Sequence, residues 1–155
     1  MSFMNTNSLD DYKNDIKPDQ STTPFNDSFS SIAWSPTLGP IFASTSWDGE
    51  LRVYEVGQTQ MGPAISQKLA YKFNSPALKC CWSSQTNHIY VGLMDGSIKA
   101  FDVNTSQLAD IGKHNTAISS LNFIPGQNAL ISTGYDNIVN FWSPGNSSPV
   151  LNFNV

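Results

Sequence analysis

One pattern occurs three times in this chain and constrains its fold more than any other feature of the sequence. A run of small and β-branched residues leads into a tight turn that contains an aspartate, and an aromatic residue follows six positions after that aspartate. The turn aspartates are Asp48, Asp95 and Asp136, and the aromatic residues are Tyr54, Phe101 and Trp142. Successive turns are 47 and 41 residues apart, a spacing typical of internal repeats that each form one supersecondary unit.

Each unit carries two further anchors upstream of its turn. An aromatic residue lies 13 or 14 positions before the turn aspartate, and an asparagine lies eight positions before that aromatic residue. The aromatic residues are Trp34, Trp82 and Phe123, and the asparagines are Asn26, Asn74 and Asn115. The longer first spacing contains an insert, residues 57–68, so all three units share one layout.

The third unit shows how each repeat is divided into strands. Three β-rich runs, AISSLNFI, ALISTG and IVNFWS, are separated by the turn residues PGQN and YDN. Turn signals about every 8 to 12 residues, without a long run of helical period, indicate an all-β fold. A single sheet of about four antiparallel strands cannot bury both of its faces, whereas sheets stacked around an axis can, as in a β-propeller. The sequence therefore predicts three propeller blades, residues 25–66, 67–109 and 110–155.

Residues 1–24 differ in composition from the repeats. They are polar and acidic with few aliphatic side chains, so burial cannot offset the entropy of ordering them, and we expect this tail to be mostly disordered. The net charge of the chain is −4, which is not the basic excess of an autonomous nucleic-acid binder. No run approaches the roughly 20 apolar residues of a membrane span, and no membrane partner is expected.

Few residues of this chain could carry chemistry. The two histidines, His88 and His114, are 26 positions apart, and neither belongs to a catalytic or zinc-binding motif. Cys80 and Cys81 are adjacent, so their side chains point to opposite faces of a strand and do not share a metal site; such cysteines suit a reducing compartment. We therefore expect no enzyme activity, no cofactor, no metal and no small-molecule substrate.

The repeat resembles that of the WD-repeat family. In that family a hydrogen-bonded set links the loop before the first strand to the second strand, the turn and the third strand; the matching residues of the third unit are His114, Ser132, Asp136 and Trp142. The resemblance implies structural roles for all three turn aspartates. It also implies a ring of about seven blades, within the usual range for propellers, of which this chain supplies three.

This chain departs from the family pattern at several positions. No unit closes with a literal Trp-Asp pair; the closing pairs are Tyr54-Glu55, Phe101-Asp102 and Trp142-Ser143. The second unit has Phe73 where the family often has histidine and Val91 where it often has serine. We expect the second unit to lack the polar network and to rely on packing.

The order of the details is similar to one branch of the family. The segments SSIAWSPTLGPIFASTSWDGELRVYEV, ALKCCWS, AFDVNTSQ and KHNTAISSL, the insert that begins with GQT and the end SSPVLNFNV occur in the order seen in the messenger-RNA export propellers of the nuclear pore, which resemble the mitotic spindle checkpoint propellers.

This resemblance implies a protein-interaction scaffold of the nucleus, the nuclear envelope and pore, and the cytoplasm. The implied partner is a GLEBS-type nucleoporin segment, and the alternative is a checkpoint adaptor that binds a related segment of a kinase. The polar tail lies where the family supplies a strand that closes the ring, so part of residues 14–23 is expected to be extended.

Three large side chains, each immediately before a turn aspartate, are the candidate partner-binding residues: Trp47, Met94 and Tyr135. In a propeller these turns share one rim, and side chains of this kind are enriched at protein-binding hot spots. Packing over the neighbouring blade is the structural alternative. Arg52 and Lys99 each follow a turn aspartate by four positions, but Asn140 takes that place in the third unit, so this partial basic stripe is weak evidence for a nucleic-acid contact. The alternative from a different class is a direct RNA-binding protein, if the blades outside this chain are basic.

Overall fold

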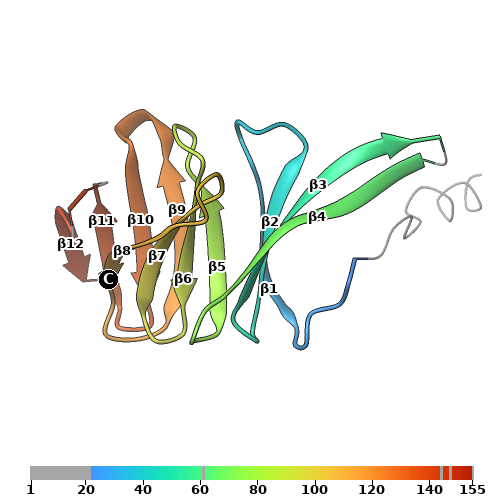
Figure 1. Ribbon diagram of the computed structural model, residues 1–155. Coiled ribbons are helices and arrows are strands. Elements are labelled where there is room, and N and C mark those ends of the chain that lie inside the picture. Colours follow the sequence, from blue (N-terminus) through green and yellow to red (C-terminus); the bar gives the residue numbers. More distant parts are fainter. Residues whose placement is uncertain (1–21, 61, 144, 147, 155) are drawn as a thin grey trace, which may run out of the picture.

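The described part of the chain folds into three four-stranded antiparallel sheets that stand side by side (Figure 1). The computed structural model describes residues 22–60, 62–143, 145–146 and 148–154. The first sheet contains β1 (Phe29–Trp34), β2 (Ile41–Ser46), β3 (Glu50–Thr59) and β4 (Gly62–Lys72). The second contains β5 (Ala77–Trp82), β6 (His88–Leu93), β7 (Ser97–Asp102) and β8 (Leu108–Lys113). The third contains β9 (Ile118–Ile124), β10 (Ala129–Gly134), β11 (Ile138–Trp142) and β12 (Leu151–Asn154).

These sheets confirm the prediction of an all-β fold with three four-stranded units. Across the described residues the one helical element is a short 3-10 turn, Pro125–Gln127, which lies in the predicted turn PGQN. None of the described segments forms a helix long and apolar enough to cross a membrane.

Two hydrophobic cores hold the three sheets together. The core between the first and second sheets includes Leu51 and Val53 from β3 and Val91 and Phe101 from the second sheet, all at most 1% exposed. The core between the second and third sheets includes Tyr90, Ile98, Ala100, Ile118, Leu121, Leu130 and Trp142. Because side chains alternate along a strand, β6 supplies both cores, and the second sheet is buried on both faces.

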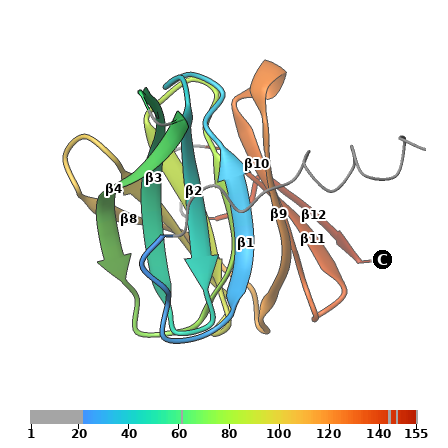
Figure 2. The ribbon, with the colours of Figure 1, turned by 90° about the vertical axis from the view of Figure 1, so that its right-hand side faces the viewer.

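The first strand of each sheet lies on the inner side of the stack. Strand β5 contacts both β1 and β9, and Figure 2 shows β1 on the side of the first sheet that is nearer to β9. Trp82 Nε1 donates a hydrogen bond to the carbonyl oxygen of Ala33 at 2.9 Å, and Ser30 Oγ donates to the carbonyl of Ala77. These bonds fix the inner strands against each other, and the turns β2–β3, β6–β7 and β10–β11 lie along one edge, at the bottom of Figure 1.

The insert of the first unit extends the sheet. Strands β3 and β4 stay paired as far as Thr59 and Gly62, and in Figure 1 this two-stranded ribbon projects beyond the rest of the sheet. The segments that connect one sheet to the next are residues 73–76 and 114–117. The boundaries between units predicted from the sequence, 66/67 and 109/110, instead fall inside β4 and β8. Regular spacing does not distinguish an extended hairpin from a loop. Most of the tail, residues 1–21, and most of its proposed closing strand lie outside the described residues.

The residue after each turn aspartate adopts the left-handed backbone conformation. Gly49 has φ +87°, Gly96 has φ +86° and Asn137 has φ +62°. Glycine adopts this conformation without steric cost, and asparagine is among the side chains that tolerate it best. The three turns thus share one backbone conformation, and the residue before each aspartate is exposed in all three, although its identity differs.

Candidate functional site

The turn aspartate of the third sheet is the centre of a hydrogen-bond network. His114 Nδ1 donates to the carboxylate of Asp136, at 3.1 Å from Oδ1 and 3.2 Å from Oδ2. The same carboxylate accepts from the backbone N–H groups of Asn115 at 3.1 Å and Ile138 at 3.2 Å. Asp136 thus ties the loop before β9 to the turn between β10 and β11.

The network continues from His114 into the sheet. Trp142 Nε1 donates to Ser132 Oγ at 2.8 Å, and Ser132 Oγ donates to His114 Nε2 at 2.8 Å. Asn140 Nδ2 lies 3.2 Å from the same ring nitrogen. This sequence of donors and acceptors places the N–H proton of the His114 imidazole on Nδ1, which faces Asp136. The structure therefore brings together the four side chains expected from the family resemblance. They are hydrogen-bonded to one another, and such a network rigidifies a fold.

The network also lowers the pKa of the Asp136 carboxyl. Burial acts to raise this pKa, but the hydrogen bonds from His114 and from the backbone of Asn115 and Ile138 outweigh burial, so the pKa lies below its ordinary value of 3.8. A carboxyl group with a lowered folded-state pKa contributes its full stability above the unfolded-state pKa. That contribution is lost as the pH falls through the folded-state pKa.

Replacing Asp136 by Ala is expected to lower the free energy of unfolding by about 1 to 3 kcal/mol at pH 7, because buried donors lose their acceptor. Asp95→Ala is the matched control and should cost less, since Asp95 accepts from the backbone N and Oγ of Ser97, at 2.9 and 2.6 Å, and from no buried histidine. Urea unfolding of both variants measures the difference, and equal losses would contradict a special role for the third turn. The difference in free energy of unfolding between wild type and Asp136→Asn should also become smaller below about pH 4, because the Asp136 carboxylate is then increasingly protonated.

The first sheet uses a different arrangement at the corresponding place. The Arg52 guanidinium carbon lies 3.9 Å from the centroid of the Phe25 ring. Arg52 also pairs with Glu50 at 2.6 Å and donates to the carbonyl oxygen of Thr23 at 2.6 Å. A cation over an aromatic face takes the place of the histidine of the third sheet. The carboxylate is kept, since Asp48 accepts from the backbone N–H groups of Asn26 at 3.2 Å and Glu50 at 2.9 Å, as Asp136 does in the third sheet. The 7% exposure of Arg52 means that this side chain holds residues 23–25 in place and is not presented to a nucleic acid.

Lys99, the second residue of the suggested basic stripe, is engaged as well. It forms an ion pair with Asp110 across the β7–β8 pairing. The proposed stripe is therefore wrong at both of its positions, because one cation is buried and the other is neutralised by its neighbour. The sequence shows that Arg52 and Lys99 occupy the same position relative to a turn aspartate, but it gives no information on the side chains with which they interact.

The three candidate partner-binding residues line one groove. Trp47, Met94 and Tyr135 are 44%, 50% and 72% exposed and come from the turns of three different sheets. The groove has a volume of about 370 Å³, and its other lining residues are Ser30, Leu78, Lys79, Ala117 and Ile118. We call this surface the rim groove. Its long exposed side chains stand around a floor supplied by the inner strands and the segments just before them.

The floor of the rim groove was missed by the reasoning from sequence. Ala77-Leu78 and Ala117-Ile118 occupy corresponding places near the starts of β5 and β9, and this recurrence was the available signal. The sequence alone does not distinguish these residues from other strand positions, because a hydrophobic residue in a propeller strand is usually core. Leu78 and Ile118 are in fact 7% and 1% exposed, so they form a firm apolar base and add little accessible surface of their own.

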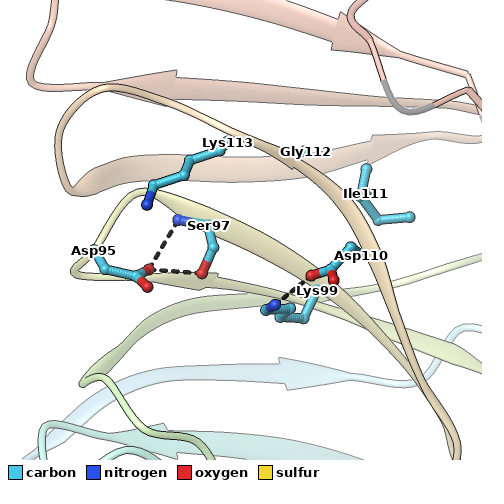
Figure 3. A pocket seen from close by; sticks show the side chains of 7 residues that line it. All are labelled: Asp95, Ser97, Lys99, Asp110, Ile111, Gly112 and Lys113. Carbon is cyan, nitrogen blue, oxygen red and sulfur yellow. Dashed lines mark hydrogen bonds and ion pairs between the residues drawn. The ribbon is translucent and has the colours of Figure 1, made fainter.

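A second hollow lies beside β7 and β8 (Figure 3). Its lining residues are Asp95, Ser97, Lys99, Asp110, Ile111, Gly112 and Lys113. The charges here are matched within the protein, since Lys99 pairs with Asp110 and Asp95 accepts from Ser97. Burial acts to raise the pKa of Asp95, but these hydrogen bonds and the nearby lysines lower it below its ordinary value. The Asp95 carboxylate and the Ser97 hydroxyl of this lining are thus engaged with each other, and the Lys99 ammonium is engaged with Asp110.

The two cysteines are core residues on opposite faces of β5, as predicted. Cys80 belongs to the core between the first and second sheets, whereas Cys81 packs against the core between the second and third. Burial raises the pKa of the Cys80 thiol to about 11 and raises that of Cys81 as well. A thiol with a raised pKa is a poor nucleophile at neutral pH. Within the described residues no group of three metal-ligating side chains comes together.

Comparison with known proteins agrees with this architecture. The model of the WD domain, G-beta repeat, matches residues 105–143. The solved structure of U3-55K superposes with a TM-score of 0.73 at 18% identity, over 86% of this chain and 41% of that chain. The sheets, the hydrogen-bonded set of the third turn and these matches show a WD repeat at residues 105–143 and the fold of a partial β-propeller.

Within that class the chain is similar to two groups of proteins, which confirms the resemblance in the sequence. It is 32% identical to the Poly(A)+ RNA export protein of Schizosaccharomyces pombe over 94% of this chain and 40% of the relative. It is 33% identical to mitotic checkpoint protein bub-3 of Caenorhabditis elegans over 66% of this chain and 29% of the relative. Drosophila melanogaster protein Rae1 is 24% identical over 97% of this chain and 42% of the relative. The chain thus spans well under half the length of these relatives.

Proposed function

We propose that this protein is a non-catalytic interaction scaffold that binds a short segment of a partner protein in the rim groove. The observation that carries the proposal is the convergence of Trp47, Met94 and Tyr135 from three separate turns on one groove. Large, exposed side chains over a firm apolar floor are typical of protein-binding hot spots. Neither the second hollow nor the buried cysteines supply a competing chemical function.

The partner is a GLEBS-type nucleoporin segment, and the process is export of messenger RNA through the nuclear pore. The similarity to the Schizosaccharomyces pombe export protein, which extends over 94% of this chain, favours this partner. The protein would then reside in the nucleus, at the nuclear envelope and pore, with a cytoplasmic fraction.

A checkpoint adaptor that binds a related segment of a mitotic kinase is the second candidate. The comparable identity of 33% to the Caenorhabditis elegans checkpoint protein favours it, although over 66% of this chain. The partial basic stripe lends no support to direct RNA binding, because Arg52 and Lys99 are both engaged within the protein.

Isothermal titration of the full-length protein with the two candidate segments separates these functions. We expect the nucleoporin segment to bind more tightly than the kinase segment. Tighter binding of the kinase segment would assign the protein to the checkpoint, and binding of neither segment would overturn the scaffold proposal in this form. An unrelated segment of equal length and charge is the control for nonspecific association.

A further inference from the structure

One side chain in the rim groove differs in kind from the others. Lys79 lies near the start of β5, where the pairing with β6 shifts register between Ala77 and Lys79. Such a bulge changes the direction of the side chains next to it. Lys79 is a half-buried residue, and its side chain lines a groove whose walls are otherwise formed mainly by apolar and aromatic side chains.

Three other cations near the turns have partners within the protein. Arg52 pairs with Glu50 at 2.6 Å, Lys72 lies 3.7 Å from Asp48, and Lys99 pairs with Asp110. Among the described residues, no carboxylate lies within ion-pair distance of Lys79.

The carboxylates closest in sequence to the groove are committed to their own turns. Asp48 accepts from the backbone N–H of Glu50 at 2.9 Å, and Asp95 accepts from that of Ser97 at 2.9 Å. Asp136 accepts from His114 and two backbone N–H groups. The turn geometry thus holds three negative charges away from Lys79, and the groove keeps an uncompensated positive charge. A ligand carboxylate that enters the groove therefore meets this positive charge without competition from an acidic side chain of the protein, and such charge complementarity favours one class of partner over another.

We propose that Lys79 is a specificity-determining residue of the rim groove and selects a partner segment in which an aspartate or glutamate is flanked by large apolar side chains. This inference rests on the proposed function, since it names the chemistry of the segment bound at the same site. The carboxylate pairs with the ammonium of Lys79, while the flanking side chains pack against Trp47, Met94 and Tyr135. A segment with a basic residue at that point is rejected, because two like charges would meet in a partly desolvated groove.

A reciprocal charge exchange tests the inference. The probe is the nucleoporin segment, together with a series in which each of its acidic residues is replaced singly by lysine. Lys79→Glu is expected to weaken binding of the unchanged segment at least tenfold, and one lysine-bearing segment should regain most of that loss on the Lys79→Glu protein. Lys79→Met keeps the length of the side chain and should give a smaller loss. Lys113→Glu is the matched control, because Lys113 lies outside the rim groove, and it should change the affinity less than twofold.

The outcomes distinguish this inference from the proposed function. If the unchanged segment binds wild type and Lys79→Glu equally well, Lys79 does not select charge and the inference is overturned, while the scaffold proposal stands. If Lys79→Glu weakens binding but no lysine-bearing segment restores it, the direct pairing is overturned as well. If the segment does not bind wild type, both fail together. Thermal melts of the variants show whether a loss of affinity reflects unfolding, and in that case the Lys79→Met protein decides.

Discussion

Replacing Trp47, Met94 and Tyr135 together by Ala is expected to weaken binding of the nucleoporin segment at least about thirtyfold, the cost of losing a single hot spot of about 2 kcal/mol. The three side chains contribute the exposed walls of one groove, so their truncation removes contact area without opening the core. The floor residues Leu78 and Ile118 remain in place. The loss should therefore appear as faster dissociation with little change in thermal stability.

Titration of wild type and the triple variant, with thermal melts alongside, measures both quantities. Leu108→Ala is a suitable control, because Leu108 is 38% exposed on the outer strand β8 and does not line the rim groove. Unchanged affinity of the triple variant would show that the three side chains are not a binding surface. A large fall in melting temperature would instead support the structural alternative, in which they pack over the neighbouring sheets.

The fold was predictable from sequence because its determinants are local. The aspartate, the following left-handed residue and the spacing to the next aromatic residue describe a single turn and its two strands, and the structure has that turn three times. The network around Asp136 was expected from the resemblance to the WD-repeat family, which gives the four positions of the hydrogen-bonded set. The all-β fold and the opposite orientations of Cys80 and Cys81 follow from the period of a strand.

The parts that were not predictable depend on strand register and on contacts between segments that the repeat spacing does not relate. Nothing in the spacing shows that Arg52 stacks on Phe25 or that Lys99 pairs with Asp110, because these partners lie on segments whose approach is set by the tertiary fold. Lys79 was overlooked for a similar reason. Its significance depends on the absence of a carboxylate nearby, which is a property of three turns together and not of the strand in which it lies.

A second large effect is expected at a glycine that joins the second sheet to the third. Gly96→Ala should lower the free energy of unfolding by about 3 kcal/mol or more. A loss of this size is expected where a substitution strains a special backbone conformation. Gly96 has φ +86°, where an added Cβ is strained in itself. That Cβ would also lie 2.4 Å from the carbonyl oxygen of His114 and 2.5 Å from that of Thr116. Both contacts are with backbone, so no side-chain rotation can relieve them.

The loss should extend beyond the turn because the displaced backbone carries a network residue. The N–H of His114 donates to the carbonyl oxygen of Gly96 at 2.9 Å, so a shift of this segment moves the imidazole that faces Asp136. Gly49→Ala, with its two closest backbone contacts at 2.9 Å, should cost less than Gly96→Ala. Gly126→Ala has open space around its Cβ and should change stability by less than about 0.5 kcal/mol. Urea unfolding of the three variants gives the ranking, and a cost for Gly96→Ala no larger than that for Gly126→Ala would refute the close approach of the turn to the segment before β9.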